Sequence, residues 1–250
     1  MNIRLVVFVL AILAGNCTGL HADELAADND AVSTHIHDPF EKVNRVVFKF
    51  NTKTDDILVR PLVEGYQRVV PKPVANAVHR FFANLGEVSQ FSNDLMQGKV
   101  RQAGNDAGRF LINTTIGLLG IYDPASSMGL KVSEPEDFGQ TLAVWGIDDG
   151  PYLMLPLMGP STLRDAPGMY VDSSFLHPVS YIDHVRTRNT FIGLGIIDLR
   201  AMLMDTEKLI EGDSYTFIRE AWGQRRNYLI LDGAVEDDFG GGFEEEDFDF

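Results

Sequence analysis

Residues 108–117 read GRFLINTTIG, residues 136–145 read EDFGQTLAVW, and residues 150–165 read GPYLMLPLMGPSTLRD; these three phrases decide the fold. The first phrase ends a predicted helix over residues 100–116, in which Gly104 and Gly108 are spaced to let a second helix pack closely. Between residues 117 and 168 the pattern breaks into glycine, proline and aromatic residues. The segment therefore predicts a helix followed by a Gly/Pro-rich apolar loop region.

The loop over residues 151–160 is apolar, but it cannot be one uninterrupted helix. Its prolines at positions 151, 156 and 160 each remove a backbone donor and clash with the preceding turn. The loop is also too short to cross a bilayer. Two interpretations stay open, a buried loop and a loop that lines a cavity. The candidate lining side chains are Leu153, Met154, Leu157 and Met158.

Residues 38–58 predict a basic amphipathic helix, with Asp38 as its N-cap and Pro39 at the first helical position. Its apolar arc consists of Phe40, Val43, Val46, Val47, Phe50, Ile57 and Leu58. Its basic arc consists of Lys42, Arg45, Lys49 and Lys53. Such a helix is typical of a membrane interface, where Phe40, Val43, Val47 and Phe50 would face the lipid. The alternative is a surface helix that packs its apolar arc on the protein's own core.

Helical spacing also recurs in three other segments. After the proline pair at positions 71 and 73, an apolar stripe predicts a helix that ends between Asn93 and Leu95. Further helices are expected over residues 187–203 and 214–231, the second capped by Asp213 or Ser214. Strand signals are few, and no run of 18 apolar residues follows the N-terminal segment. The predicted fold class is all-α.

The two ends of the chain have their own compositions. Residues 1–22 predict a secretory signal peptide, with cleavage after Ala22 favoured over lipidation of Cys17, the single cysteine. Residues 23–37 are expected to be a flexible segment. Residues 233–250 are expected to be a disordered acidic tail, because they lack apolar periodicity. Its acids are Glu236, Asp237, Asp238, Glu244, Glu245, Glu246, Asp247 and Asp249.

The net charge of −15 excludes nucleic acid as a partner, because proteins hold nucleic acid with clustered lysine and arginine. Motifs for a hydrolase elbow, a phosphate loop or a zinc protease do not occur, so no catalytic residue, cofactor or metal is expected. His35 and His37 are expected to face solvent. Ser161, Asp165 and His177 are not expected to converge as a triad.

The three phrases, together with DPFEKVNR at residues 38–45, closely resemble the MlaA (VacJ) family of Gram-negative envelope proteins. The resemblance covers residues 38–232, which are expected to form one domain. It implies an irregular ring-like assembly of amphipathic helices on the periplasmic side of the outer membrane. It also implies that the protein removes misplaced outer-leaflet phospholipid beside a trimeric porin and passes it to a periplasmic lipid carrier.

A lipid-moving protein of this kind would need cations near the phosphate headgroup. The candidates are Arg164, Arg186 and Arg188, because guanidinium matches phosphate in a bidentate way. The alternatives are a local ion pair for Arg164 and surface solvation for Arg186 and Arg188. A further alternative for the whole protein is a structural envelope protein that binds the membrane surface without moving lipid; a lipid hydrolase is the weakest hypothesis.

Overall fold

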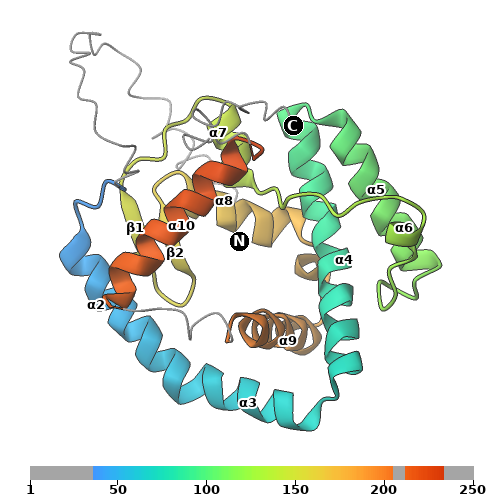
Figure 1. Cartoon of the computed structure of the whole chain (residues 1–250), viewed down its shortest axis with the longest axis horizontal. Coiled ribbons are helices and arrows are strands. Elements are labelled where there is room, and N and C mark those ends of the chain that lie inside the picture. Colours follow the sequence, from blue (N-terminus) through green and yellow to red (C-terminus); the bar gives the residue numbers. More distant parts are fainter. Residues whose placement is uncertain (1–35, 205–211, 234–250) are drawn as a thin grey trace, which may run out of the picture. The chain divides into compact units, whose positions relative to one another are not determined.

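The computed structural model describes residues 36–204 and 212–233, and helices dominate both ranges (Figure 1). The predicted signal peptide with Cys17, most of the predicted flexible segment with His35, and nearly all of the acidic tail lie outside the described residues. In the first half the helical elements are α2 (Glu41–Thr54), η1 (Asp55–Val59), α3 (Arg60–Val69), α4 (Lys72–Gln97), α5 (Val100–Thr115), α6 (Pro124–Ser127) and α7 (Phe138–Val144). A hairpin of β1 (Tyr152–Leu155) and β2 (Gly159–Thr162) follows. The remaining elements are α8 (Asp165–Val171), η2 (Asp172–Leu176), η3 (Pro178–Tyr181), α9 (Val185–Leu203) and α10 (Ser214–Ile230).

The all-α fold class is confirmed, whereas the ring-like assembly stays a prediction. The predicted cap of the first helix is wrong. Helix α2 begins at Glu41 after the N-cap residue Phe40, and the Asp38 side chain accepts no hydrogen bond from the amides of the first turn. The Asp38 carboxylate instead accepts hydrogen bonds from Asn44, Tyr215 and Arg219. Asp38 thus joins the start of α2 to α10.

The helix also continues beyond the predicted end at Leu58. A single π-helical turn, η1, follows α2 directly and leads into α3. Pro61 lies in the first turn of α3, where a missing backbone N–H costs little. Helix α4 begins after Pro71 and ends at Gly98, whose φ of 80° lets the chain reverse into α5.

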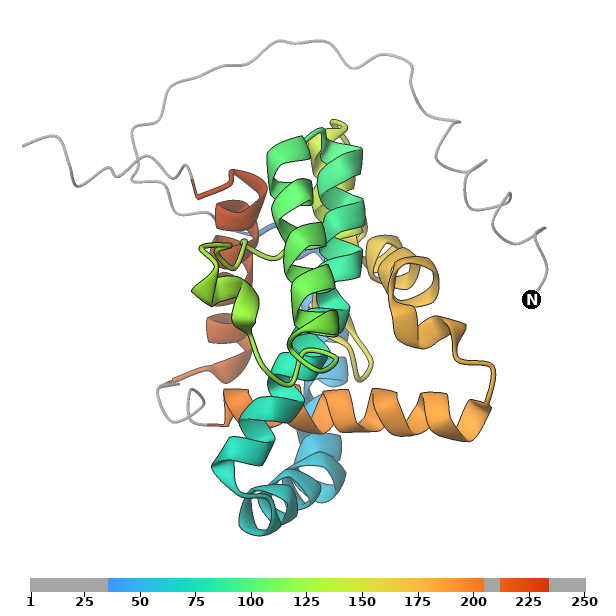
Figure 2. The ribbon, with the colours of Figure 1, turned by 90° about the vertical axis from the view of Figure 1, so that its right-hand side faces the viewer.

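Helices α4 and α5 lie side by side, as Figures 1 and 2 both show. The expected close packing at Gly104 is wrong, because a Cβ built there meets nothing within 4 Å. At Gly108 a Cβ would lie 3.2 Å from the Leu130 side chain. Of these two glycines, Gly108 is therefore the tightly packed one. Polar contacts hold the pair together instead. Arg109 donates from Nε to Glu87 Oε1 at 2.8 Å and from Nη1 to the Leu130 carbonyl at 2.9 Å.

The apolar loop at residues 151–160 is a two-stranded antiparallel hairpin rather than irregular backbone, with Tyr152 opposite Thr162 and Leu155 opposite Gly159. Tyr152 and Met154 point into the protein and pack with Tyr215. The prolines do not prevent this, because Pro151 precedes β1, Pro156 lies in the turn, and Pro160 lies in β2, an edge strand of a two-stranded sheet.

Burial in this protein is inverted relative to an ordinary soluble domain. Within the described residues eight apolar side chains are buried, against seventeen polar or charged ones. Contacts between buried side chains are therefore to a large extent hydrogen bonds and ion pairs. Large apolar side chains are exposed along α2, α3, α5 and α9. Within residues 36–204 and 212–233, no helix is long and apolar enough to cross a membrane.

One member of the polar interior, Asp94, should make stability depend on pH. Its carboxyl oxygens are buried without a hydrogen-bond partner, and burial together with neighbouring Asp106 raises its pKa to about 8. The unfolded chain loses this proton above about pH 4, whereas the folded protein holds it to about pH 8. Stability should therefore fall as pH rises through that window, by up to about 1.4 kcal/mol per pH unit.

Asp94→Asn is expected to remove this decline, because an amide cannot ionise. Thermal unfolding measured across the window checks it, with Asp148→Asn as the control, since Asp148 is exposed. An Asp94→Asn protein that loses stability with rising pH as steeply as the parent would contradict the assignment.

Candidate functional site

Helix α2 holds the hairpin in place through two asparagines that lie seven residues apart, on one face of the helix. Asn44 donates to the Tyr152 carbonyl at 3.1 Å and accepts from the Met154 amide at 2.9 Å. Asn51 donates to the Leu155 carbonyl at 2.9 Å and accepts from the Leu157 amide at 2.8 Å. The two amide side chains thus satisfy the outer edge of β1 as a neighbouring strand would. They fix the position of the hairpin turn relative to α2.

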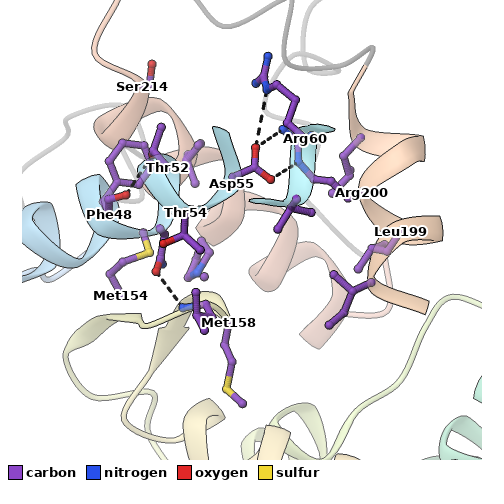
Figure 3. Close-up of a pocket in the computed structure, with 18 of the residues that line it drawn as sticks. Phe48, Thr52, Thr54, Asp55, Arg60, Met154, Met158, Leu199, Arg200 and Ser214 are labelled. Atoms are coloured by element: carbon purple, nitrogen blue, oxygen red, sulfur yellow. Dashed lines mark hydrogen bonds and ion pairs between the residues drawn. The ribbon is translucent and has the colours of Figure 1, made fainter. Parts of the chain in front are cut away.

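The hairpin turn forms one wall of a cavity of about 810 Å³ (Figure 3). The other walls come from α2 with η1, from α9 and from the start of α10. Most of the lining is apolar and consists of Phe48, Val59, Met154, Leu157, Met158, Ile196, Leu199, Leu203, Met204 and Ile218. A volume of this size is within the range of cavities that hold small organic ligands.

One side of the cavity carries charge. Asp55 in η1 accepts two hydrogen bonds from Arg200 of α9, Nε to Oδ1 at 2.9 Å and Nη2 to Oδ2 at 2.8 Å. Arg60 at the start of α3 approaches Asp55 Oδ2 at 4.0 Å and Asp56 Oδ1 at 3.4 Å. Figure 3 shows Asp55 between the two guanidinium groups, across the cavity from Met154 and Met158.

The cavity therefore combines an apolar wall with two arginines that a carboxylate orients. The arrangement suits an amphipathic ligand whose hydrocarbon part lies along the thioethers and leucines and whose polar end lies toward the ion-paired side of the cavity.

Three of the four predicted lining residues are in this cavity, namely Met154, Leu157 and Met158. Leu153 is not, because side chains alternate along a strand and it points to the opposite face of β1 from Met154.

The three arginines predicted as headgroup contacts do not line the cavity. Arg164 is buried, and its Nε donates to Asp165 at 2.8 Å, which is the local ion pair of the alternative interpretation. Arg188 donates to the Ile182 carbonyl at 3.4 Å, and Arg186 is exposed near the start of α9.

Sequence reasoning missed the charged residues that do line the cavity: Asp55, Arg60 and Arg200. One signal for Arg200 exists, since it is the single base in the second half of the helix predicted over residues 187–203, where Asp198 is the other charged residue. No local signal could have paired it with Asp55, which is 145 residues away.

In the described residues, Ser161, Asp165 and His177 each bond to groups other than one another. Ser161 Oγ bonds to the Thr162 carbonyl and to Met169 sulfur, while the Asp165 carboxylate binds arginines. His177 accepts from the Val179 amide. The described ranges contain no group of three or more potential metal ligands, and His37 is exposed.

The apolar arc of α2 divides into an exposed and a packed part. Phe40, Val43 and Phe50 are exposed, as an interfacial helix requires. Val47 differs: it packs against the cluster of Tyr152, Met154 and Tyr215. Its assignment to the interface stays a prediction, and its packing against the hairpin favours the alternative interpretation at this one position.

Comparisons with known proteins agree on one family. A family model described as MlaA lipoprotein matches residues 36–229. The intermembrane phospholipid transport system lipoprotein MlaA of Shigella flexneri is 34% identical over 205 residues, covering 80% of each chain. Its namesake in Escherichia coli K12 is 33% identical over 204 residues, again 80% of each.

Two further similarities differ in coverage. A Rickettsia felis protein is 37% identical over 156 residues, and the chain spans 62% of that relative's length. A solved chain, from work on the structural basis for maintenance of bacterial outer membrane lipid asymmetry, superposes with a TM-score of 0.67 at 32% identity. That superposition covers 77% of this chain and 98% of the solved one.

Proposed function

Because the chain belongs to the MlaA lipoprotein family, we propose that it moves phospholipid without catalysing a reaction. In this proposal it removes misplaced phospholipid from the outer leaflet of the outer membrane and passes it to a periplasmic lipid carrier. It works on the periplasmic side of that membrane, beside a trimeric porin, and so maintains lipid asymmetry. The names of the Shigella and Escherichia relatives support the general role.

The observation that carries the proposal is the cavity between α2, the hairpin and α9. A phospholipid needs an apolar wall for its acyl chains and polar partners for its phosphate, because an unpaired buried charge is costly. The cavity supplies apolar side chains on one side and a polar side on the other, made by the ion pairs of Asp55 with Arg60 and Arg200 and by Asn51, Thr52 and Ser214.

The inverted burial supports a position at a membrane. Exposed apolar area as extensive as that on α2, α3 and α9 is unfavourable in water and marks a contact with lipid or protein. Val43 and Phe50 on α2 contribute to it, and Lys42 and Lys49 on the same helix are exposed and suit anionic headgroups.

A charge placed among the apolar lining should block lipid passage. Leu199→Glu puts a carboxylate into the cavity wall, and we expect a loss of lipid transfer of about tenfold or more, since a charge placed against hydrocarbon costs about 2.5–3.5 kcal/mol once acyl chains fill the cavity. In cells that lack the chromosomal copy, this variant should leave the outer membrane as leaky to detergent as the deletion does, with phospholipid accumulating in the outer leaflet.

Leu194→Glu is the matched control, because Leu194 is exposed on the same helix but does not line the cavity. Both variants must fractionate with the outer membrane like the parent. Full complementation by Leu199→Glu would mean that lipid does not pass through this cavity. It would favour the alternative of a structural protein that binds the membrane surface without moving lipid.

A further inference from the structure

A second cavity, of about 860 Å³, lies where α4 turns into α5, and its charge is basic. Lys99, Arg101 and Lys131 line it, and no carboxylate does. Within the described residues the side chains of Arg101 and Lys131 form no hydrogen bond or ion pair. Lys99 already pairs with Glu136 and Asp232, so Arg101 and Lys131 are the cations of this hollow that should attract an anionic group.

The same cavity has an apolar rim. Val100 and Val132 both line it and are 70% and 71% exposed. The hollow therefore offers two kinds of contact at once, cations for acids and branched aliphatic side chains for an apolar partner. A simple inorganic anion would use only the first.

One segment of the chain has the complementary composition. Residues 236–249 carry eight acids and no base, and three phenylalanines stand among the acids, at positions 239, 243 and 248. The chain enters this segment beside the hollow, because Asp232 forms an ion pair with Lys99. Figure 2 shows the end of α10 at the same end of the molecule as the turn between α4 and α5.

The distance to be bridged is short. Glu236 follows Asp232 by four residues, which span up to about 14 Å when extended. A tether of this length gives a millimolar effective concentration, so weak contacts suffice for binding. Each exposed ion pair contributes only about 0.2–1 kcal/mol, so the bound state would be reversible and sensitive to salt.

We propose that the acidic, phenylalanine-containing segment 236–249 binds the basic cavity of Lys99, Arg101 and Lys131 within the same molecule. This interaction is separate from lipid passage through the first cavity, which lies between α2, the hairpin and α9.

The test places the photo-crosslinker p-benzoylphenylalanine at position 243 of the full-length protein in detergent. We expect crosslinks within one molecule to residues 98–105 or 129–133, mapped by mass spectrometry. Arg101→Glu with Lys131→Glu should reduce their yield at least fivefold, and about 0.5 M salt should reduce it as well. Lysines in place of Glu244, Glu245 and Glu246 should restore the crosslink to the charge-reversed protein.

Arg186→Glu with Arg225→Glu is the matched control, because both arginines are exposed and lie on other helices. This pair should leave the yield unchanged. Crosslinks to other surfaces, to a second copy of the chain or to bound lipid would overturn the proposal. So would a yield that the charge reversal at positions 101 and 131 does not change.

Discussion

Arg226→Ala is expected to destabilise the folded protein by about 3 kcal/mol, because each lost hydrogen bond between charged groups contributes about 1.5–3 kcal/mol and Asp165 keeps its second partner, Arg164. Arg226 donates from Nε to Asp165 Oδ2 at 2.8 Å and from Nη2 to Asp137 Oδ1 at 2.8 Å. These bonds join α10 to the starts of α7 and α8. The Asp165 contact carries most of the effect, because the Asp165 side chain is 4% exposed whereas Asp137 is partly open to solvent.

For a domain of this size about 1 kcal/mol shifts the melting temperature by roughly 2–4 °C, so a fall of roughly 10 °C is expected. Circular dichroism during heating in detergent measures it. Arg225→Ala is the control, since that neighbouring arginine is exposed and should change the melting temperature little. Equal shifts for the two variants would mean that the ion pairs of Arg226 contribute nothing specific.

Val43→Asp or Phe50→Asp in α2 is expected to release the protein from the membrane without unfolding it. Val43 and Phe50 are 62% and 53% exposed, so neither has a large contact within the protein to lose. A charge in the hydrocarbon region costs about 2.5–3.5 kcal/mol, which shifts an interfacial equilibrium by about a hundredfold. Membrane fractionation of cells that express Val43→Asp or Phe50→Asp checks this.

Val47→Asp provides the contrast on the same helix. Val47 packs against the cluster around Tyr152, so a carboxylate there should lower the melting temperature in detergent. If Val43→Asp and Phe50→Asp also lower the melting temperature but leave membrane binding intact, α2 does not lie in the interface.

Where a segment's own residues set its conformation, sequence reasoning was accurate. The helix predicted over residues 100–116 is α5 (Val100–Thr115), and the one predicted over residues 214–231 is α10 (Ser214–Ile230), capped by Asp213 as expected. Proline and glycine at helix ends act within one turn, so their effect can be read locally. The all-α class follows from such segments.

The hairpin shows where local reasoning failed. An apolar run with three prolines hides the alternation of a strand, because Leu153 and Met154 are both apolar although only Met154 is buried. Residues 152–155 are extended because their backbone has partners on both sides: β2 on one edge, and on the other Asn44 and Asn51, which lie more than 100 residues away. No window around the hairpin contains those asparagines.

The sequence by itself determined the helices, the family and the amphipathic character of α2, since these depend on residue order and spacing. Only the tertiary structure decided which polar residues meet. It turned Asp38 from a cap into a link to α10, put Val47 on the packed side of α2, and joined Asp55 to Arg200 in the cavity wall. The physical reason is that a buried charged side chain needs a partner, which its residue type predicts. Which residue becomes that partner depends on how the chain packs in three dimensions.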